Sequence, residues 1–119
     1  MRLLVLAGGA IGSVIRSGAE ELLTIGPLPW ATLLVNVVGS IGLGLLIGRS
    51  LSRPAESRHI PFLGVGVMGA LTTFGGVMVQ ALDISDAGAP GNAVLYVALS
   101  VSGGLVAALI ALRLAAAAR

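Results

Sequence analysis

The chain has 119 residues, of which 56% are hydrophobic and 10% are charged, and its mean hydropathy is +1.04. A soluble chain is about 25% charged, and a soluble domain this small could not hide so much apolar surface from water. The composition therefore indicates a single domain whose solvent is a lipid bilayer. It contains no cysteine, which excludes a disulfide framework and thiol chemistry.

The basic residues do not indicate a nucleic-acid partner. All seven are arginines, and they are scattered along the chain with no basic run and almost no aromatic residues between them. The single histidine, His59, and the lack of an acidic cluster argue against a catalytic metal site. No nucleotide-binding motif or covalent nucleophile stands out, so we do not expect an enzyme.

Four apolar segments are long enough to cross a membrane, which takes about 20 residues. They cover residues 3–25, 28–48, 60–82 and 91–112, and the connections between them contain proline, glycine or charged residues. The first segment looks superficially like a signal peptide, but three more follow it, so we interpret it as the first span. The sequence predicts an all-α membrane protein with four transmembrane helices.

The arginines are unevenly divided between the two ends of these helices. With four spans, both termini and the connection at residues 49–59 share one face of the membrane. The arginines on that face are Arg2, Arg49, Arg53, Arg58, Arg113 and Arg119. The opposite face has acids at positions 20, 21, 83 and 86 and no basic residue outside a span. The positive-inside rule therefore predicts an inner (plasma) membrane protein with both termini in the cytoplasm.

Small residues recur along the predicted helices and allow close helix approach. They are Gly8, Gly12, Ser40, Gly44, Gly48, Gly66 and Ala70. Their pattern fits packing within the chain or an interface between subunits.

Polar side chains at membrane depth are costly and are therefore functional candidates. Asn36 lies in the middle of the second span, with Thr32 one turn earlier on the same face. Tyr96 and Ser100 are one turn apart in the fourth span. Each set could line a polar path or simply bond two helices together. Arg16, inside the first span, could reach the interface, pair with the nearby acids or line a vestibule that attracts anions.

The third span is interrupted at residues 68–76, MGALTTFGG. Three glycines and two adjacent threonines weaken the helix there. A broken helix would free backbone carbonyls, which are good ligands for a hard cation such as sodium. The alternative is an unbroken helix with a glycine-mediated crossing. Phe74, beside the interruption, could pack in the core or offer its electropositive ring edge to an anion.

Several segments together resemble one known family. They are GGAIGSVIR (residues 8–16), TLLVNVVGS (32–40) and GVGVMGALTTFGG (64–76), with Tyr96 and Ser100 in the fourth span. The chain resembles the CrcB/Fluc fluoride channels along nearly its whole length. The resemblance implies a subunit that exports fluoride passively. It also implies an antiparallel, dual-topology dimer with two pores.

The resemblance also implies roles for single residues. Asn36 would coordinate fluoride, Phe74 would be the first of two pore phenylalanines, and Tyr96 and Ser100 would lie on a polar track. We group Thr32 with these pore residues because it shares the face of Asn36.

Three further residues have implied positions outside the pore. Arg16 would lie near a vestibule. The backbone carbonyls of Gly69 and Thr72 would hold a structural sodium ion at the dimer centre.

The chain departs from the family pattern after Phe74. Val77 replaces the second phenylalanine, Gln80 replaces an acid, and Gly104 replaces a serine of the fourth span. Together with the arginine bias, these changes predict an antiparallel heterodimer with a second chain of the same family, with a homodimer as the alternative. The other hypotheses are a non-conducting structural subunit and a small proton-coupled exporter, although the exporter would need an acid deep in the first span.

Overall fold

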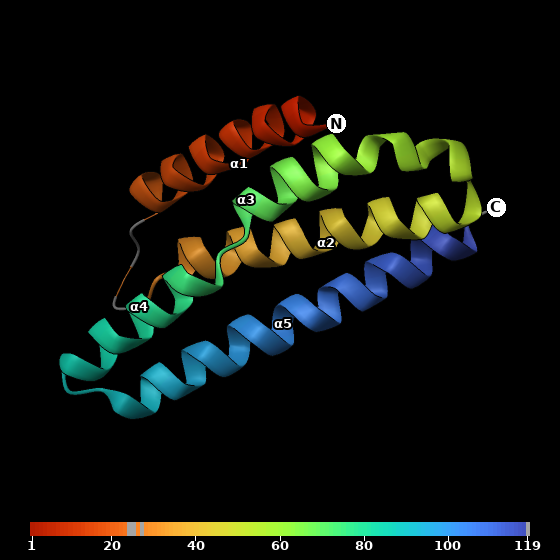
Figure 1. Cartoon of the computed structure of the whole chain (residues 1–119). Coiled ribbons are helices and arrows are strands. Elements are labelled where there is room, and N and C mark those ends of the chain that lie inside the picture. The colour runs from red at the N-terminus through yellow and green to blue at the C-terminus, as the bar shows by residue number, and fades with distance from the viewer. Residues whose placement is uncertain (24–25, 27, 119) are drawn as a thin grey trace.

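The computed structural model describes residues 1–23, 26 and 28–118. Its long helices run back and forth in the order α1 (Arg2–Leu22), α2 (Trp30–Ser52), a composite third span (Pro54–Asp86) and α5 (Pro90–Ala117), as Figure 1 shows. Within the described residues, these four helices are long and apolar enough to cross a membrane, and there is no strand. The predicted all-α architecture with four spans is confirmed.

The third span is built from several pieces. They are a 3₁₀ helix, η1 (Pro54–His59), a π-helix, η2 (Ile60–Met68), and the α-helices α3 (Gly69–Leu71) and α4 (Phe74–Asp86). Between α3 and α4 the chain is extended, with φ −79° and ψ 145° at Thr72 and φ −144° and ψ 122° at Thr73. The predicted break is confirmed, and the alternative of an unbroken helix is wrong.

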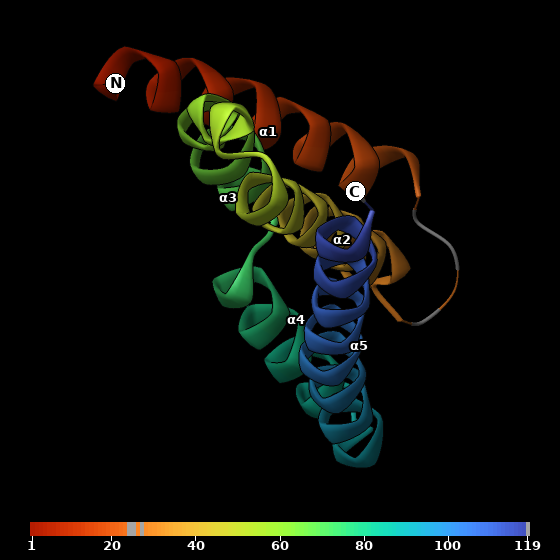
Figure 2. The same cartoon turned by 90° about the vertical axis from the view of Figure 1, so that its right-hand side faces the viewer.

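The break changes the helix against which the third span packs. Before it, η2 and α3 pack against α1; after it, α4 packs against α5. Figure 2 shows the two arrangements, with α1 along η2 and α3 and with α4 beside α5. In the described part of the chain, α1 packs against neither α4 nor α5. The two extended threonines therefore lie where two helix pairs meet.

Glycines bring two of these helix pairs into backbone contact. A Cβ atom at Gly8 would collide with the carbonyl oxygen of Phe62 in η2, and one at Gly44 would collide with the carbonyl oxygen of Ala108 in α5. At these positions the small residues therefore serve packing within the chain, which was one of the two interpretations of the pattern.

The helices differ in length from the predicted spans. α2 continues to Ser52 instead of residue 48, and α5 continues to Ala117 instead of residue 112. Hydropathy marks the apolar core of a helix, but good helix formers extend it beyond the hydrocarbon until a breaker such as Pro54 intervenes. α1 ends at Leu22, whereas residues 24 and 25 of the predicted first span, residue 27 of the next connection and Arg119 lie outside the described residues.

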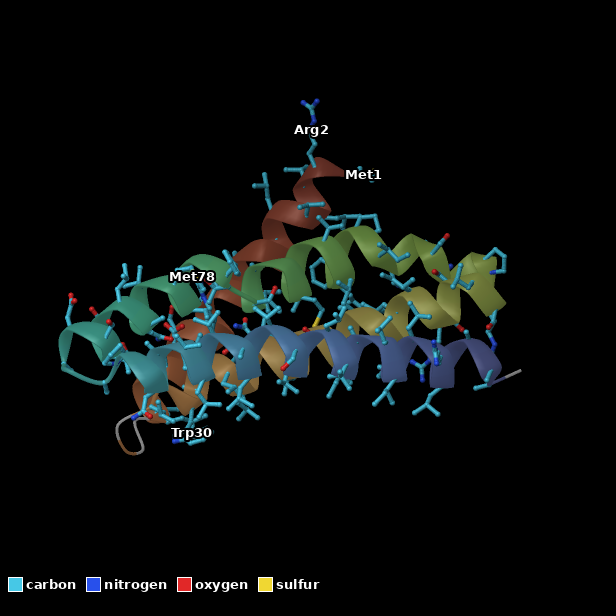
Figure 3. All side chains as sticks on the ribbon, turned by 90° about the horizontal axis from the view of Figure 1, so that it is seen from below. Met1, Arg2, Trp30 and Met78 are labelled. Atoms are coloured by element: carbon cyan, nitrogen blue, oxygen red, sulfur yellow. The ribbon has the colours of Figure 1, made fainter. Side chains whose placement is uncertain are left out.

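The outer surface is apolar on every span. Its exposed large side chains include Leu3 on α1, Val38 on α2, Val65 on η2 and Val94 on α5. Figure 3 shows Met1 and Arg2 projecting from the free end of α1, away from the other helices. Such a surface suits contact with lipid or with another membrane-embedded chain.

Candidate functional site

The break borders a pocket of about 330 Å³ between α2, the third span and α5. Its polar lining residues are Asn36, Ser40, Thr72, Thr73 and Ser100. Its other lining residues include Gly69 and Phe74. The structure therefore brings five of the predicted site residues together, whereas Thr32, Tyr96 and Arg16 do not line this pocket.

Asn36 holds the break through two hydrogen bonds to a single residue 37 positions away. Its Oδ1 accepts from the backbone N–H of Thr73 at 2.7 Å, and its Nδ2 donates to the carbonyl of Thr73 at 3.1 Å. The backbone N–H and C=O that they meet fix which end of the amide is oxygen. Because an amide nitrogen carries two N–H groups, one N–H of Asn36 remains for another acceptor.

The two threonines end one helix and begin the next. The Thr72 hydroxyl donates to the carbonyl of Met68 at 3.0 Å, and the Thr73 hydroxyl accepts from the backbone N–H of Gly76 at 3.0 Å. Thr73 is thus the N-cap of α4, a position that threonine favours. No role was predicted for Thr73 from the sequence, although its place just before a new helix was a usable signal.

The carbonyls predicted to hold sodium are available as ligands. Among residues 1–23, 26 and 28–118, no hydrogen bond ends on the carbonyl oxygen of Gly69 or Thr72. An unpaired carbonyl inside a bilayer is costly, and it is tolerated where it faces a cavity or an ion. Backbone carbonyls freed by a helix break are the kind of oxygen ligand that sodium takes in membrane proteins. The carbonyl oxygens of Gly69 and Thr72 are therefore of the ligand type that suits a sodium ion.

Ser100 has a buried hydroxyl that bonds to nothing in the described structure. The residue is 5% exposed, lines the pocket and is flanked by α2 and α4. A hydroxyl left without a partner in an apolar setting is destabilising. Ser102, two residues later, shows the usual solution, because its hydroxyl donates to the carbonyl of Ala98. Ser100 therefore keeps a free donor and acceptor at the pocket.

Tyr96 has a different role from Ser100, although one turn separates them. Its hydroxyl donates to Oε1 of Gln80 at 2.6 Å, and Nε2 of Gln80 donates to the hydroxyl of Thr32 at 2.8 Å. Tyr96 and Thr32 are both fully buried, at 2% and 0% exposure. Gln80 therefore connects α2, α4 and α5 through a continuous polar chain. From the sequence, Gln80 was interpreted only as a replaced acid, because spacing along the chain does not reveal this role.

Phe74 and Val77 begin α4 with opposite exposure. Phe74 is 68% exposed, so it does not pack in the core of this chain, whereas Val77 is 2% exposed. Both line the pocket, but only the aromatic ring has an electropositive edge to present there. Gly104 also lines the pocket, and a Cβ added to it would lie 3.1 Å from the hydroxyl oxygen of Ser40.

Arg16 lies apart from the pocket, on α1. Its side chain is half-buried, and its Nε is buried without a hydrogen-bond partner in the described structure. No ion pair among the described residues joins it to Glu20 or Glu21. Its place near a vestibule stays a prediction.

The fold and the site define a four-span helical membrane protein with a polar pocket at a broken helix. Residues 3–112 match the family described as "CrcB-like protein, Camphor Resistance (CrcB)". The chain belongs to the CrcB family.

Individual relatives support this assignment. The chain is 39% identical over 115 residues to "Fluoride-specific ion channel FluC" of Thermus thermophilus, which covers 94% of this chain and 92% of the relative. It is 40% identical over 106 residues to "Fluoride-specific ion channel FluC 2" of Thermobifida fusca, covering 87% and 78%. It is 41% identical over 104 residues to "Fluoride-specific ion channel FluC" of Agrobacterium fabrum, covering 82% of each chain.

Proposed function

We propose that this chain is a subunit of a fluoride channel that lets fluoride leave the cell passively and so lowers its toxicity in the cytoplasm. The relatives described above are named as channels, which agrees with the expectation that the chain is not an enzyme. The observation that carries the proposal is the buried, unpartnered hydroxyl of Ser100 at the pocket. A donor kept free in an apolar protein is available to an anion that has lost its water.

Fluoride holds its water tightly, so a pore must replace that water with hydrogen-bond donors. The pocket offers the hydroxyl of Ser100, the remaining N–H of Asn36 and the ring edge of Phe74. Thr32 on α2 and Tyr96 on α5 would continue the path, once their bonds to Gln80 on α4 exchange for bonds to the ion.

A matched pair of serine variants tests this proposal. In proteoliposomes that contain the assembled channel, Ser100→Ala should slow fluoride efflux at least about tenfold, since losing one ligand hydrogen bond costs on the order of 1.5 kcal/mol. Ser102→Ala removes an exposed hydroxyl from the same helix and should leave efflux unchanged. Equal efflux from both variants would refute the role of Ser100.

A structural sodium ion belongs to the same proposal. The carbonyls of Gly69 and Thr72 would hold it, and its charge would stabilise a backbone arrangement that leaves carbonyls without donors. What supports this is the lack of any hydrogen bond to either oxygen among the described residues.

We further propose that the channel is an antiparallel heterodimer with a second chain of the same family. The pocket is flanked by exposed apolar side chains, with Phe74 at 68%, Val101 at 50% and Leu105 at 59% exposure, so it needs a cover that lipid cannot supply for its polar groups. A homodimer is the alternative, but one arginine-rich end disfavours insertion in both directions. In the dimer, Arg16 would face a vestibule.

The arginine distribution supports an inner-membrane location with both termini in the cytoplasm. The N-terminal end of α1, the C-terminal ends of α2 and α5, and η1 all lie toward the same end of the molecule (Figure 1). Five of the six arginines assigned to this face, all but Arg119, fall in the described residues. In that location, membrane lipid would be the other partner of the chain, in contact with its exposed apolar side chains.

A non-conducting structural subunit is the second candidate. Val77 favours it, because this buried aliphatic side chain lines the pocket where the resemblance implies a second pore phenylalanine. If the subunit is structural only, Ser100→Ala should leave fluoride efflux intact. A proton-coupled exporter has less support, since the acids of α1, Glu20 and Glu21, lie at the end of that helix.

A further inference from the structure

We infer that Asn36 is a positioning residue for the cation site, because its amide sets the direction of the Thr72 carbonyl. The inference rests on the sodium site within the proposed function. It gives Asn36 a task separate from contact with the anion.

The first step is the geometry of one peptide unit. The carbonyl of Thr72 and the N–H of Thr73 belong to the same peptide plane, and in a trans peptide these two groups point in opposite directions. The N–H of Thr73 donates to Oδ1 of Asn36 at 2.7 Å. The carbonyl of Thr72 must therefore point away from Asn36 and from α2.

The second hydrogen bond of Asn36 fixes the following peptide unit. Its Nδ2 donates to the carbonyl of Thr73 at 3.1 Å, so both backbone groups of Thr73 are bound to one side chain. Asn36 is only 9% exposed, which limits competition from water for these bonds. Rotation of the Thr72–Thr73 peptide would break at least one of them.

No other side-chain hydrogen bond at the break, among the described residues, fixes the orientation of the Thr72–Thr73 peptide. The hydroxyl of Thr72 bonds back to Met68, and the hydroxyl of Thr73 bonds forward to Gly76. Those bonds finish the helices on either side, but neither involves the peptide between the two threonines. Among the described residues, Asn36 is the only side chain that forms hydrogen bonds to the backbone of Thr73.

The two tasks of Asn36 use different atoms. Orienting the Thr72 carbonyl requires the acceptor Oδ1, whereas contact with an anion requires the remaining N–H on Nδ2. Asn36→Asp retains an oxygen acceptor of the same shape in either protonation state. Asn36→Ala removes both groups. The pair of variants therefore separates positioning from anion contact.

The experiment measures the thermal unfolding midpoint of the purified, assembled protein in NaCl and in N-methyl-D-glucamine chloride. For the natural protein, sodium should raise the midpoint, since an ion bound only by the folded state stabilises it. Asn36→Ala should lose this rise, and Asn36→Asp should keep it while its fluoride efflux falls. Val35→Ala, a truncation of the buried neighbour on α2, should lower the midpoint in both salts and keep the rise.

Each outcome of this experiment either supports or overturns the inference about Asn36. A full sodium response in Asn36→Ala would overturn the inference, as would its loss in a folded Asn36→Asp protein; if Asn36→Ala does not fold, Asn36→Asp alone decides. No sodium response in the natural protein would also overturn it, although normal fluoride efflux would leave the channel function standing. Conversely, absent efflux with the expected sodium pattern would overturn the channel function and support the inference.

Discussion

Gln80 connects two hydroxyls that lie far apart in the sequence. Its amide donates to Thr32 on α2 and accepts from Tyr96 on α5, so it satisfies both buried groups. The resemblance implies an acid at this position, and an ionised carboxylate would accept from two hydroxyls but could not donate. The substitution therefore preserves a three-helix connection and changes the direction of one hydrogen bond.

Gln80→Leu should destabilise the chain by about 1 to 2 kcal/mol, because two interhelical hydrogen bonds are lost. Unfolding in denaturing detergent measures this free energy. Gln80→Glu is the matched variant: its carboxylate can accept from the hydroxyls of both Thr32 and Tyr96, so it should be destabilised less than Gln80→Leu. Identical stability of the natural protein and Gln80→Leu would contradict the structural role.

At the residue scale, polarity at membrane depth predicted which residues belong to the site, but it did not predict their hydrogen-bond partners. Asn36, Tyr96 and Ser100 stood out because they are polar at membrane depth. Whether each hydroxyl is free or bonded depends on contacts across 16 to 48 residues, which periodicity does not encode. Tyr96 proved to be bonded between helices, whereas Ser100 proved to be free.

At the scale of elements, the broken third span exchanges one helix partner for another. Glycines at residues 68–76 predicted the break, since local composition alone weakens a helix. The exchange from α1 to α5 could not be predicted, because it depends on how whole helices cross. The ends of the helices could not be predicted either, because they extend beyond the hydrocarbon, where hydropathy gives no signal.

The close crossing of α2 and α5 gives a prediction at this scale. Gly44→Ala should cost about 1 to 3 kcal/mol, because its Cβ would collide with the backbone carbonyl of Ala108, which cannot move like a side chain. Gly103→Ala is the control within the same helix pair, since its Cβ would be 3.8 Å from Val37. It should be neutral or slightly stabilising. Equal losses in the two variants would show that the crossing is not as close as described.

At the scale of the whole molecule, charge and shape lead to the same expectation. Apart from Arg16 within α1, the described arginines lie toward one end of the molecule, and the polar pocket is bordered by exposed apolar side chains near the break. We therefore expect one chain to insert in a single direction and to need a second chain that covers the pocket. A partner that inserts the other way would cover the pocket and balance the charge.

The predicted direction of insertion can be tested in cells. A reporter fused after the last residue should be found only on the cytoplasmic side, because the arginine-rich end stays inside. Replacing Arg49, Arg53 and Arg58 with glutamine should let a fraction of chains insert in the opposite direction. A natural chain with reporters on both sides would contradict the arginine argument and would favour a homodimer.

The most direct test of the central claim is anion efflux from proteoliposomes. Vesicles are loaded with potassium fluoride or potassium chloride and contain this chain alone or together with a related chain of opposite arginine bias. We expect fluoride to leave rapidly when both chains are present, slowly or not at all with this chain alone, and chloride to be retained in every case. Equal loss of fluoride and chloride, or no fluoride efflux from the pair, would contradict a fluoride channel; rapid efflux from this chain alone would contradict the required partner.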